Sequence, residues 1–204
     1  MKNIYIIGAQ STGKSTLINA LESCLEEIAN EYSSQRPLVI REVARTVLRE
    51  NHFRREDIAT LPARALQLQR HILAAQYYAE TTACPEGAST WYICDRSGLD
   101  PIVYAKCFVG DYAAAEMLAS EFWQGLEDRM KESIVILCEA GCQWLEDDGV
   151  RLMPKDEKEW MRIDAAFRDL LRIRGISFYI ISKDMTDLRE RVQYVQRHAK
   201  STGK

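Results

Sequence analysis

A glycine-rich segment near the start of the chain, GAQSTGKS (Gly8–Ser15), combines residue types that bind phosphate. It matches the pattern G-x-x-x-x-G-K-[ST] in full, and it lies between an apolar run and a helical pattern. The backbone N–H groups of such a loop form an anion cradle at the start of a helix, and its two glycines permit the tight path. We expect Lys14 to reach the β and γ phosphates of a nucleotide and Ser15 to offer its hydroxyl to Mg²⁺. The other loop residues expected to hold the nucleotide are Gly8, Ala9, Gln10, Ser11, Thr12 and Gly13.

Two acidic residues and an arginine follow the third apolar run, in the segment WYICDRSGLD. Asp95 comes at the carboxyl end of the predicted strand, a position from which an acidic side chain can hold Mg²⁺ or its waters. Arg96 follows directly, and Asp100 comes one helical turn later. A strand-terminal aspartate can also be a helix N-cap, but three charged residues in six positions favour a phosphoryl-transfer site.

A glutamate and an arginine follow the second apolar run, in the segment VIREVAR. Ligands of an open α/β sheet bind beyond the carboxyl ends of the strands, and Glu42 is expected at that edge. It could take a proton from an acceptor hydroxyl, and Arg45 is close enough in sequence to join it. The alternative is a glutamate that caps a helix among surface charges.

The segment WLEDDGVRLMP follows the fourth apolar run and is expected to close over the phosphates as a lid, over residues 139–156. Arg151 is the candidate for stabilising charge on the transferred group. A lid suits a kinase because excluding water prevents wasteful hydrolysis. The alternative is an exposed acidic loop.

The elements that would position these residues alternate along the chain. Apolar runs at Asn3–Ile7, after Pro37, and at Trp91–Cys94, Ser133–Cys138 and Ser177–Ile181 are separated by helical patterns, the last over Met185–His198. This alternation predicts an α/β fold, with a parallel sheet covered by helices on both faces. We expect one domain over residues 1–198, followed by a disordered tail over 199–204.

Composition argues against several classes of protein. The chain has 27 basic and 30 acidic residues, a net charge of −3, which does not favour general binding to nucleic acid or to anionic membranes. No apolar segment approaches the roughly 20 residues of a membrane span. We expect no cleavable signal, and the six scattered cysteines suit a cytoplasmic protein with reduced thiols. Nothing in the sequence indicates an oligomeric state.

The nucleotide could be used in more than one way. A GTPase switch should carry a base-reading NKxD segment after a later strand, and the segment ISKDM after the fifth strand matches it only loosely, at Lys183 and Asp184. We therefore expect a kinase that transfers the γ-phosphoryl of ATP to a small acceptor. The main alternative is an ATP- or GTP-dependent regulatory binding protein with slow hydrolysis and no small acceptor. A polynucleotide kinase would need a basic groove, and the basic cluster at Arg49–Asp57 is interrupted by acids.

The segments GAQSTGKST, REVAR, CDRSGLDPIVYA and EDDGVR, in this order and spacing, resemble the NadR-like family of P-loop ATPase/kinase domains. Its best-known members are the ribosylnicotinamide kinase domains of bacterial NAD regulators, and the resemblance extends from Asn3 to about Gln196. The DRS after the third strand and the glutamate after the second also resemble deoxynucleoside kinases, where these places serve the acceptor.

The resemblance implies a P-loop NTPase three-layer sandwich with a five-stranded parallel sheet of order 2-3-1-4-5. It also implies ATP with Mg²⁺ as cofactors and a nucleoside-like acceptor such as nicotinamide riboside. Carried over by position, Thr16 joins Lys14 and Ser15 at the phosphates and metal, and Asp95 lies near Mg²⁺. The resemblance further makes Glu42 the candidate base and Arg151 the lid arginine, with Asp100 and Tyr104 facing the acceptor.

Overall fold

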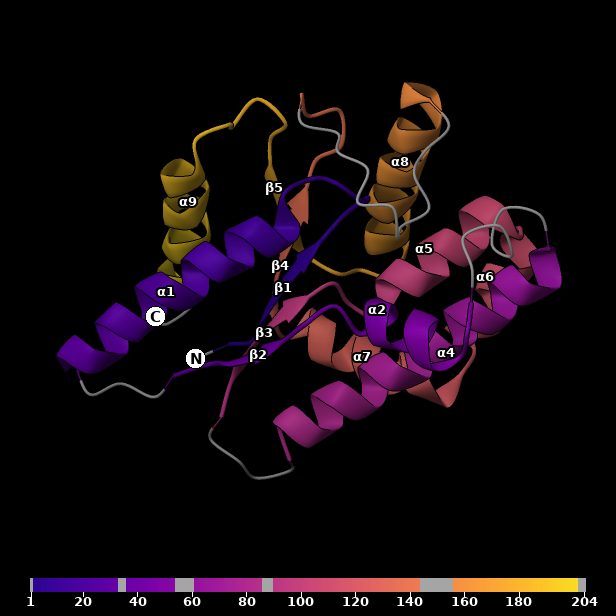
Figure 1. Ribbon diagram of the computed structural model, residues 1–204, viewed down its shortest axis with the longest axis horizontal. Helices are drawn as coiled ribbons and strands as arrows, with labels where there is room; N and C mark the ends of the chain where they lie inside the picture. The colour runs from indigo at the N-terminus through magenta and orange to yellow at the C-terminus, as the bar shows by residue number, and fades with distance from the viewer. Residues whose placement is uncertain (1, 33–35, 54–60, 86–89, 144–155, 202–204) are drawn as a thin grey trace.

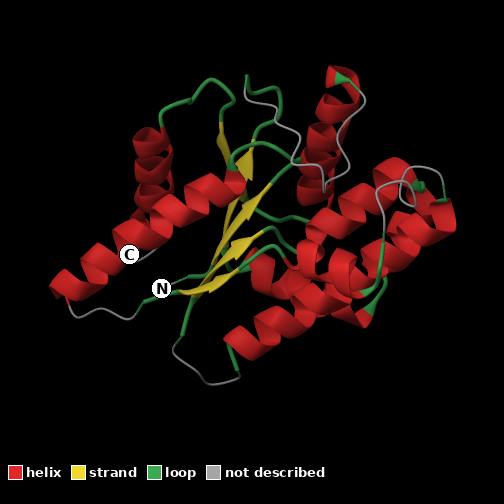
Figure 2. Cartoon of the chain, in the orientation of Figure 1, coloured by secondary structure: helices red, strands yellow, loops and turns green. Residues whose placement is uncertain are grey.

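Five short parallel strands form the central sheet, in the order β2-β3-β1-β4-β5 (Figure 2). In chain order their bounds are β1 Ile4–Ile7, β2 Leu38–Ile40, β3 Tyr92–Asp95, β4 Ile134–Cys138 and β5 Phe178–Ile181. This computed structural model describes residues 2–32, 36–53, 61–85, 90–143 and 156–201. The strand order and the parallel pairing confirm the α/β fold that the sequence predicts.

Helices cover both faces of the sheet (Figure 1). The helices α1 (Lys14–Tyr32) and α9 (Leu188–Ser201) pack on one face. The opposite face is covered by α4, α5, α6, α7 and α8, and α2 packs against α4 at the side. The bounds of this second group are α2 Val43–Glu50, α4 Pro62–Ala83, α5 Leu99–Phe108, α6 Asp111–Leu118, α7 Glu121–Lys131 and α8 Glu157–Ile173.

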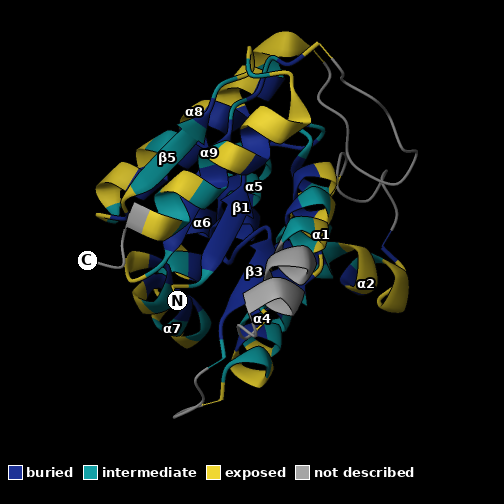
Figure 3. Cartoon of the chain, turned by 90° about the vertical axis from the view of Figure 1, so that its left-hand side faces the viewer, coloured by how far each residue is buried: buried dark blue, intermediate teal, exposed yellow. Residues whose placement is uncertain are grey.

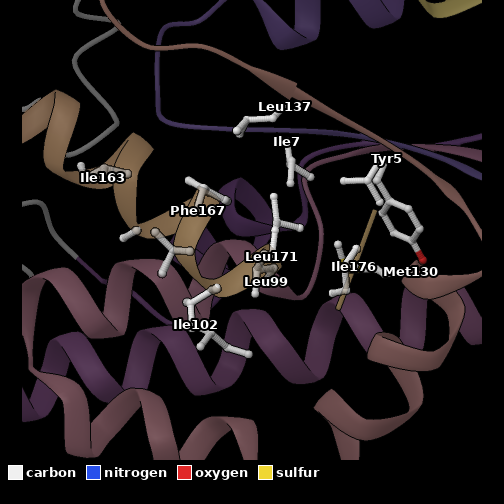
Figure 4. Close-up of a cluster of buried hydrophobic side chains, with 14 of the residues drawn as sticks. Tyr5, Ile7, Leu99, Ile102, Met130, Leu137, Ile163, Phe167, Leu171 and Ile176 are labelled. Carbon is white, nitrogen blue, oxygen red and sulfur yellow. The ribbon is translucent and has the colours of Figure 1, made fainter. Parts of the chain in front are cut away.

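The core lies in two layers because successive strand residues point to opposite faces of the sheet. In β1, Tyr5 and Ile7 pack toward α4–α8, whereas Ile4 and Ile6 pack toward α1 and α9. Figure 4 shows Tyr5, Ile7 and Phe167 among the side chains of the cluster that forms the first layer. Strands covered on both faces must be apolar throughout, which explains why β1 and β4 are almost continuous apolar runs in the sequence. The buried strands between the two helical layers are also visible in Figure 3.

The last helix differs from its predicted bounds at both ends. It begins at Leu188 rather than Met185, because the Asp187 carboxylate accepts a hydrogen bond from the Glu190 backbone N–H at 2.8 Å, as an N-capping side chain does. It continues to Ser201, so the disordered tail expected from residue 199 is wrong for residues 199–201, where Ala199 packs against the core. Residues 202–204 lie outside the described residues. None of the described helices is long and apolar enough to cross a membrane.

The carboxyl ends of β1, β2 and β3 meet at one edge of the sheet. Ile6 of β1 pairs with Asp95 of β3, and Ile40 of β2 pairs with Cys94 of β3. The loop after β1, Glu42 after β2 and Arg96 after β3 therefore come together at this edge, where an open α/β sheet binds its ligands.

Candidate active site

The loop between β1 and α1 follows a path that only glycine accommodates at its first position. Gly8 has φ = 131°, and a Cβ on it would lie 2.5 Å from the carbonyl oxygen of Cys138 in the neighbouring strand. Gly13 also has a positive φ, 78°, and its carbonyl accepts a bond from the Leu17 N–H at 3.0 Å as α1 begins. The loop thus turns tightly from the strand end into a helix N-terminus, the geometry in which backbone N–H groups bind phosphate.

Lys14 lies buried within this loop. Its Nζ donates to the Ala9 carbonyl and, at 3.2 Å, to Oγ1 of Thr12, which in turn donates to the same carbonyl at 3.0 Å. Burial and the nearby charge of Arg96 lower the pKa of Lys14 to about 8. In the part of the chain that the structure describes, the hydrogen bonds of this buried ammonium go to neutral oxygens, so an anion in the loop would stabilise its charge in place of the water that burial removes.

Ser15 and Asp95 are brought together across the edge of the sheet. Oγ of Ser15 donates to Oδ2 of Asp95 at 2.7 Å. Asp95 is only 3% exposed, and its other oxygen, Oδ1, is buried without a hydrogen-bond partner among the described residues. A serine hydroxyl beside a carboxylate with a free oxygen is a donor set that suits Mg²⁺. The described ranges contain no cluster of three or more His, Cys, Asp or Glu that would hold a metal by side chains alone.

Arg96 connects the residues predicted to serve the acceptor. It has φ = 82°, and its N–H donates to the Ile6 carbonyl at 3.0 Å, which fixes the turn after β3. Its Nε donates to Oε1 of Glu42 at 2.6 Å and its Nη1 to Oδ1 of Asp100 at 3.2 Å. Oε2 of Glu42 accepts from Nε of Arg45 at 2.9 Å. The four charged residues predicted from two separate segments therefore form one network.

Asp100 also has a local role at the start of α5. Its Oδ2 accepts from the backbone N–H of Ser97 at 2.8 Å and from the Ser97 hydroxyl at 2.9 Å. Burial raises the pKa of Asp100, and the charges of Arg96 and Lys14 oppose that rise. Asp100 thus stabilises the turn that places Arg96, in addition to any contact with a ligand.

A pocket opens beside this network, between α2, α4, α5 and the phosphate loop. Tyr104 lies on its wall and donates from its hydroxyl to Oε1 of Gln10 at 2.5 Å, so the pocket adjoins the loop directly. The lining combines apolar side chains with a few polar ones, as small-molecule pockets do. The lining residues are Gln10, Glu42, Ala44, Leu48, Leu68, Gln69, Ile72, Arg96, Asp100, Pro101 and Tyr104.

Arg45 joins Glu42 but is not among the residues that line the pocket, and Thr16 lies exposed in the first turn of α1, directly after the phosphate loop. Arg151 and residues 144–155 of the predicted lid lie outside the described residues.

Three further residues at this edge were not predicted from the sequence to belong to the site. Gln69 lines the pocket from α4, while Trp160 and Arg191 donate to carbonyls of the phosphate loop from α8 and α9. Gln69 and Arg191 are polar residues at buried positions of amphipathic helices. A polar residue that interrupts the apolar face of a predicted helix could have indicated a functional position. The sequence contains no comparable indication for Trp160, because a large aromatic residue at helical spacing is typical of the hydrophobic core.

A family model described as AAA domain matches residues 3–191. Among solved structures, deoxyadenosine kinase from M. mycoides with the products dCMP and a flexible dCDP bound is similar with a TM-score of 0.61 and 15% identity, covering 98% of this chain and 100% of that one. Thymidylate kinase from Ehrlichia chaffeensis is similar with a TM-score of 0.60 and 14% identity, covering 98% of each. No curated protein sequence matches the chain. At these identities the likeness concerns the fold alone, which this chain shares with these structures.

Proposed function

The chain belongs to this AAA domain family, and we propose that it is a P-loop kinase that transfers the γ-phosphoryl of ATP to a hydroxyl of a small nucleoside-type acceptor. One observation carries the proposal. Gln10 belongs to the phosphate loop and also lines the pocket that Glu42, Arg96 and Tyr104 border. A phosphate site and a second small-molecule pocket that share a residue are what direct transfer between two bound ligands requires.

The phosphate side would hold ATP and Mg²⁺. Lys14 would offset charge on the β and γ phosphates, and Ser15 with the free Oδ1 of Asp95 would hold the metal or its waters. The metal, when bound, would neutralise charge that develops on the transferred group. Burial of these side chains keeps their charges effective because little water screens them.

The acceptor side suits a heterocycle that carries a sugar. Leu48, Leu68 and Ile72 would contact the faces of a base, and the amide of Gln69 could read its edge. Glu42 lines the same pocket as Gln10 of the phosphate loop, and we assign it the role of general base. Arg96, bound to the same carboxylate, would orient it and stabilise charge on the phosphoryl group.

Nicotinamide riboside is the acceptor that we put first, on the resemblance to ribosylnicotinamide kinase domains. The similar structures are kinases of a deoxynucleoside and of a nucleotide, which supports a nucleoside-like acceptor without selecting one. Arg151 is proposed, from the sequence, to add charge from a lid over the phosphates.

The second candidate is an ATP- or GTP-dependent regulatory binding protein with slow hydrolysis. It is favoured by the hydrogen bonds of Glu42, because two arginines, Arg96 and Arg45, donate to its two oxygens and stabilise the charged carboxylate, which makes it a weaker base. A protein of this kind would turn over slowly whatever nucleoside is added.

The deciding experiment measures ADP release from MgATP with and without a panel of nucleosides. The panel contains nicotinamide riboside, deoxyadenosine, deoxycytidine and thymidine. Stimulation by one of them, lost in Asp95→Asn, supports the kinase and identifies its acceptor. A slow rate that no nucleoside changes would instead support the regulatory protein, and GTP in place of ATP would then test which nucleotide it uses.

A further inference from the structure

Two carbonyl groups of the phosphate loop accept hydrogen bonds from side chains far along the chain. The indole Nε1 of Trp160, in α8, donates to the Gln10 carbonyl at 2.9 Å. Nη2 of Arg191, in α9, donates to the Thr12 carbonyl at 2.8 Å. Trp160 is 3% exposed and Arg191 5%, so neither bond competes with bulk water.

These bonds set the direction of two N–H groups in the loop. In a trans peptide unit the C=O and the N–H of the next residue point in opposite directions. Holding the Gln10 carbonyl toward α8 therefore turns the N–H of Ser11 away from α8. Holding the Thr12 carbonyl toward α9 likewise turns the N–H of Gly13 away from α9. The N–H groups of a phosphate loop bind their anion only when they converge, so the carbonyls must be held outside.

The loop needs such external bonds because Ser11 and Gly13 have positive φ angles, which are uncommon in proteins. Ser11 has φ = 57°, in the left-handed region that a residue with a Cβ enters only under steric strain. Gly13 next to this segment, at φ = 78°, has no side chain to restrict it. A segment of this kind keeps one path only when the surrounding structure fixes it.

Arg191 also brings charge to the loop. The positive charges of Arg191 and Lys14 both act on the thiol of Cys138, the residue whose carbonyl faces Gly8. Burial raises the pKa of this thiol, and the two charges oppose that rise. A guanidinium donates a stronger bond to a carbonyl than a neutral donor does, and its charge favours an anion in the cradle.

We propose that Trp160 and Arg191 are positioning residues that preorganise the phosphate loop for nucleotide binding by holding two of its carbonyls outward. The inference rests on the proposed function only in that the loop binds the phosphates of ATP; it does not depend on the acceptor. It assigns to α8 and α9 a part in phosphate binding that lies beyond the loop sequence itself.

The test uses Trp160→Phe, which keeps the aromatic ring and removes the donor, together with Arg191→Gln and Arg191→Lys. Trp123→Phe is the matched control, because Trp123 is buried in α7 and its indole N–H has no hydrogen-bond partner in the part of the chain that the structure describes. Arg174→Gln is the control for the Arg191 variants, because Arg174 follows the C-terminal end of α8 and pairs with Glu127. Circular dichroism and thermal melting identify any variant that fails to fold.

The measurements are calorimetric dissociation constants for MgATP and for Mg-tripolyphosphate, which probes the cradle without a base. We expect Trp160→Phe to weaken both by about fivefold and Arg191→Gln by about tenfold or more, with partial rescue in Arg191→Lys. The controls should stay within about twofold of the native chain. In ¹H–¹⁵N spectra, the Ser11 and Gly13 amide signals should shift on adding tripolyphosphate to the native chain and shift less in the folded variants, which loss of stability alone would not produce.

Two outcomes would overturn the inference, and they differ. If the native chain binds both ligands and the folded variants bind them as the controls do, the positioning role is wrong and the proposed kinase stands. If the native chain binds neither MgATP nor tripolyphosphate, the proposed function itself is wrong, and the inference is overturned with it.

Discussion

The hydroxyl of Ser15 donates to Oδ2 of Asp95 at 2.7 Å, which joins the first turn of α1 to the end of β3. The two residues are 80 positions apart in the sequence. The bond uses one oxygen of the carboxylate and leaves the buried Oδ1 without a partner among the described residues. Because an unpaired buried carboxylate oxygen is costly, this arrangement would favour the Mg²⁺ that we propose for the site.

Asp95→Asn should separate nucleotide binding from the use of the metal. The variant keeps the shape of the side chain but loses the charge, so we expect ATP without Mg²⁺ to bind as before or slightly better. Mg²⁺ should no longer tighten binding, and turnover should fall about 10²-fold or more. Titration calorimetry with and without Mg²⁺ checks this, with Asp111→Asn, an exposed aspartate of α6, as the control. An equal effect of Mg²⁺ on Asp95→Asn and the native chain would rule out the metal role.

The affinity for MgATP should fall as the pH rises above about 8. The pKa of Lys14 in the free chain is about 8, lowered by burial and by Arg96. Phosphate beside the amine favours its protonated form, so above that pH binding must take up a proton. The dissociation constant should rise by up to about tenfold per pH unit until the pKa of the bound state is reached.

Lys14→Met is the control for this pH dependence. It should bind MgATP more weakly at pH 7 and lose the decline above pH 8, and its turnover should be about 10²–10³-fold lower. Calorimetry at pH 7, 8 and 9 in buffers of different ionisation enthalpy measures the proton uptake directly. A native chain that takes up no proton at pH 9 would contradict the assignment of Lys14 to the phosphates.

Gly8→Ala should destabilise the protein more than Gly110→Ala. Both glycines have φ = 131°, which penalises any residue with a Cβ, by about 1–3 kcal/mol. A Cβ at Gly8 would also lie 2.5 Å from the Cys138 carbonyl oxygen, whereas a Cβ at Gly110 would meet nothing within 4 Å. Urea unfolding of the two variants compares the steric part, since the two glycines share the same φ. Equal losses of unfolding free energy would show that the loop moves aside without cost.

Glu42→Gln should abolish stimulation by the acceptor while leaving MgATP binding within about threefold of the native chain. The amide keeps the size of the side chain but cannot take a proton, and loss of a general base costs about 10²–10⁴-fold in rate. ADP release with the stimulating nucleoside is the measurement. Glu22→Gln is the control, because Glu22 of α1 forms an exposed ion pair with Arg41, which follows β2. Stimulation retained in Glu42→Gln would mean that another group accepts the proton.

Local pattern was enough to predict the phosphate loop and the layered sheet. The loop pattern fixes glycines where the backbone turns and a lysine and serine where the helix starts, all within eight positions. Parallel strands end at a common edge, so the segments after β1, β2 and β3 had to meet there. That rule predicted from the sequence alone that Glu42, Arg96 and Asp100 share one site. It did not predict the hydrogen bonds between them.

Only the tertiary structure decided which side chains hold these residues in place. The bonds from Trp160 and Arg191 to the loop span 150 and 179 positions, and the bond from Tyr104 to Gln10 spans 94. The sequence period tells which face of a helix is buried, but not what that face meets. The partner of each buried face depends on how α5, α8 and α9 pack against the sheet. The sequence therefore determined the chemistry of the phosphate site, whereas packing determined how that site is oriented and what lies beside it.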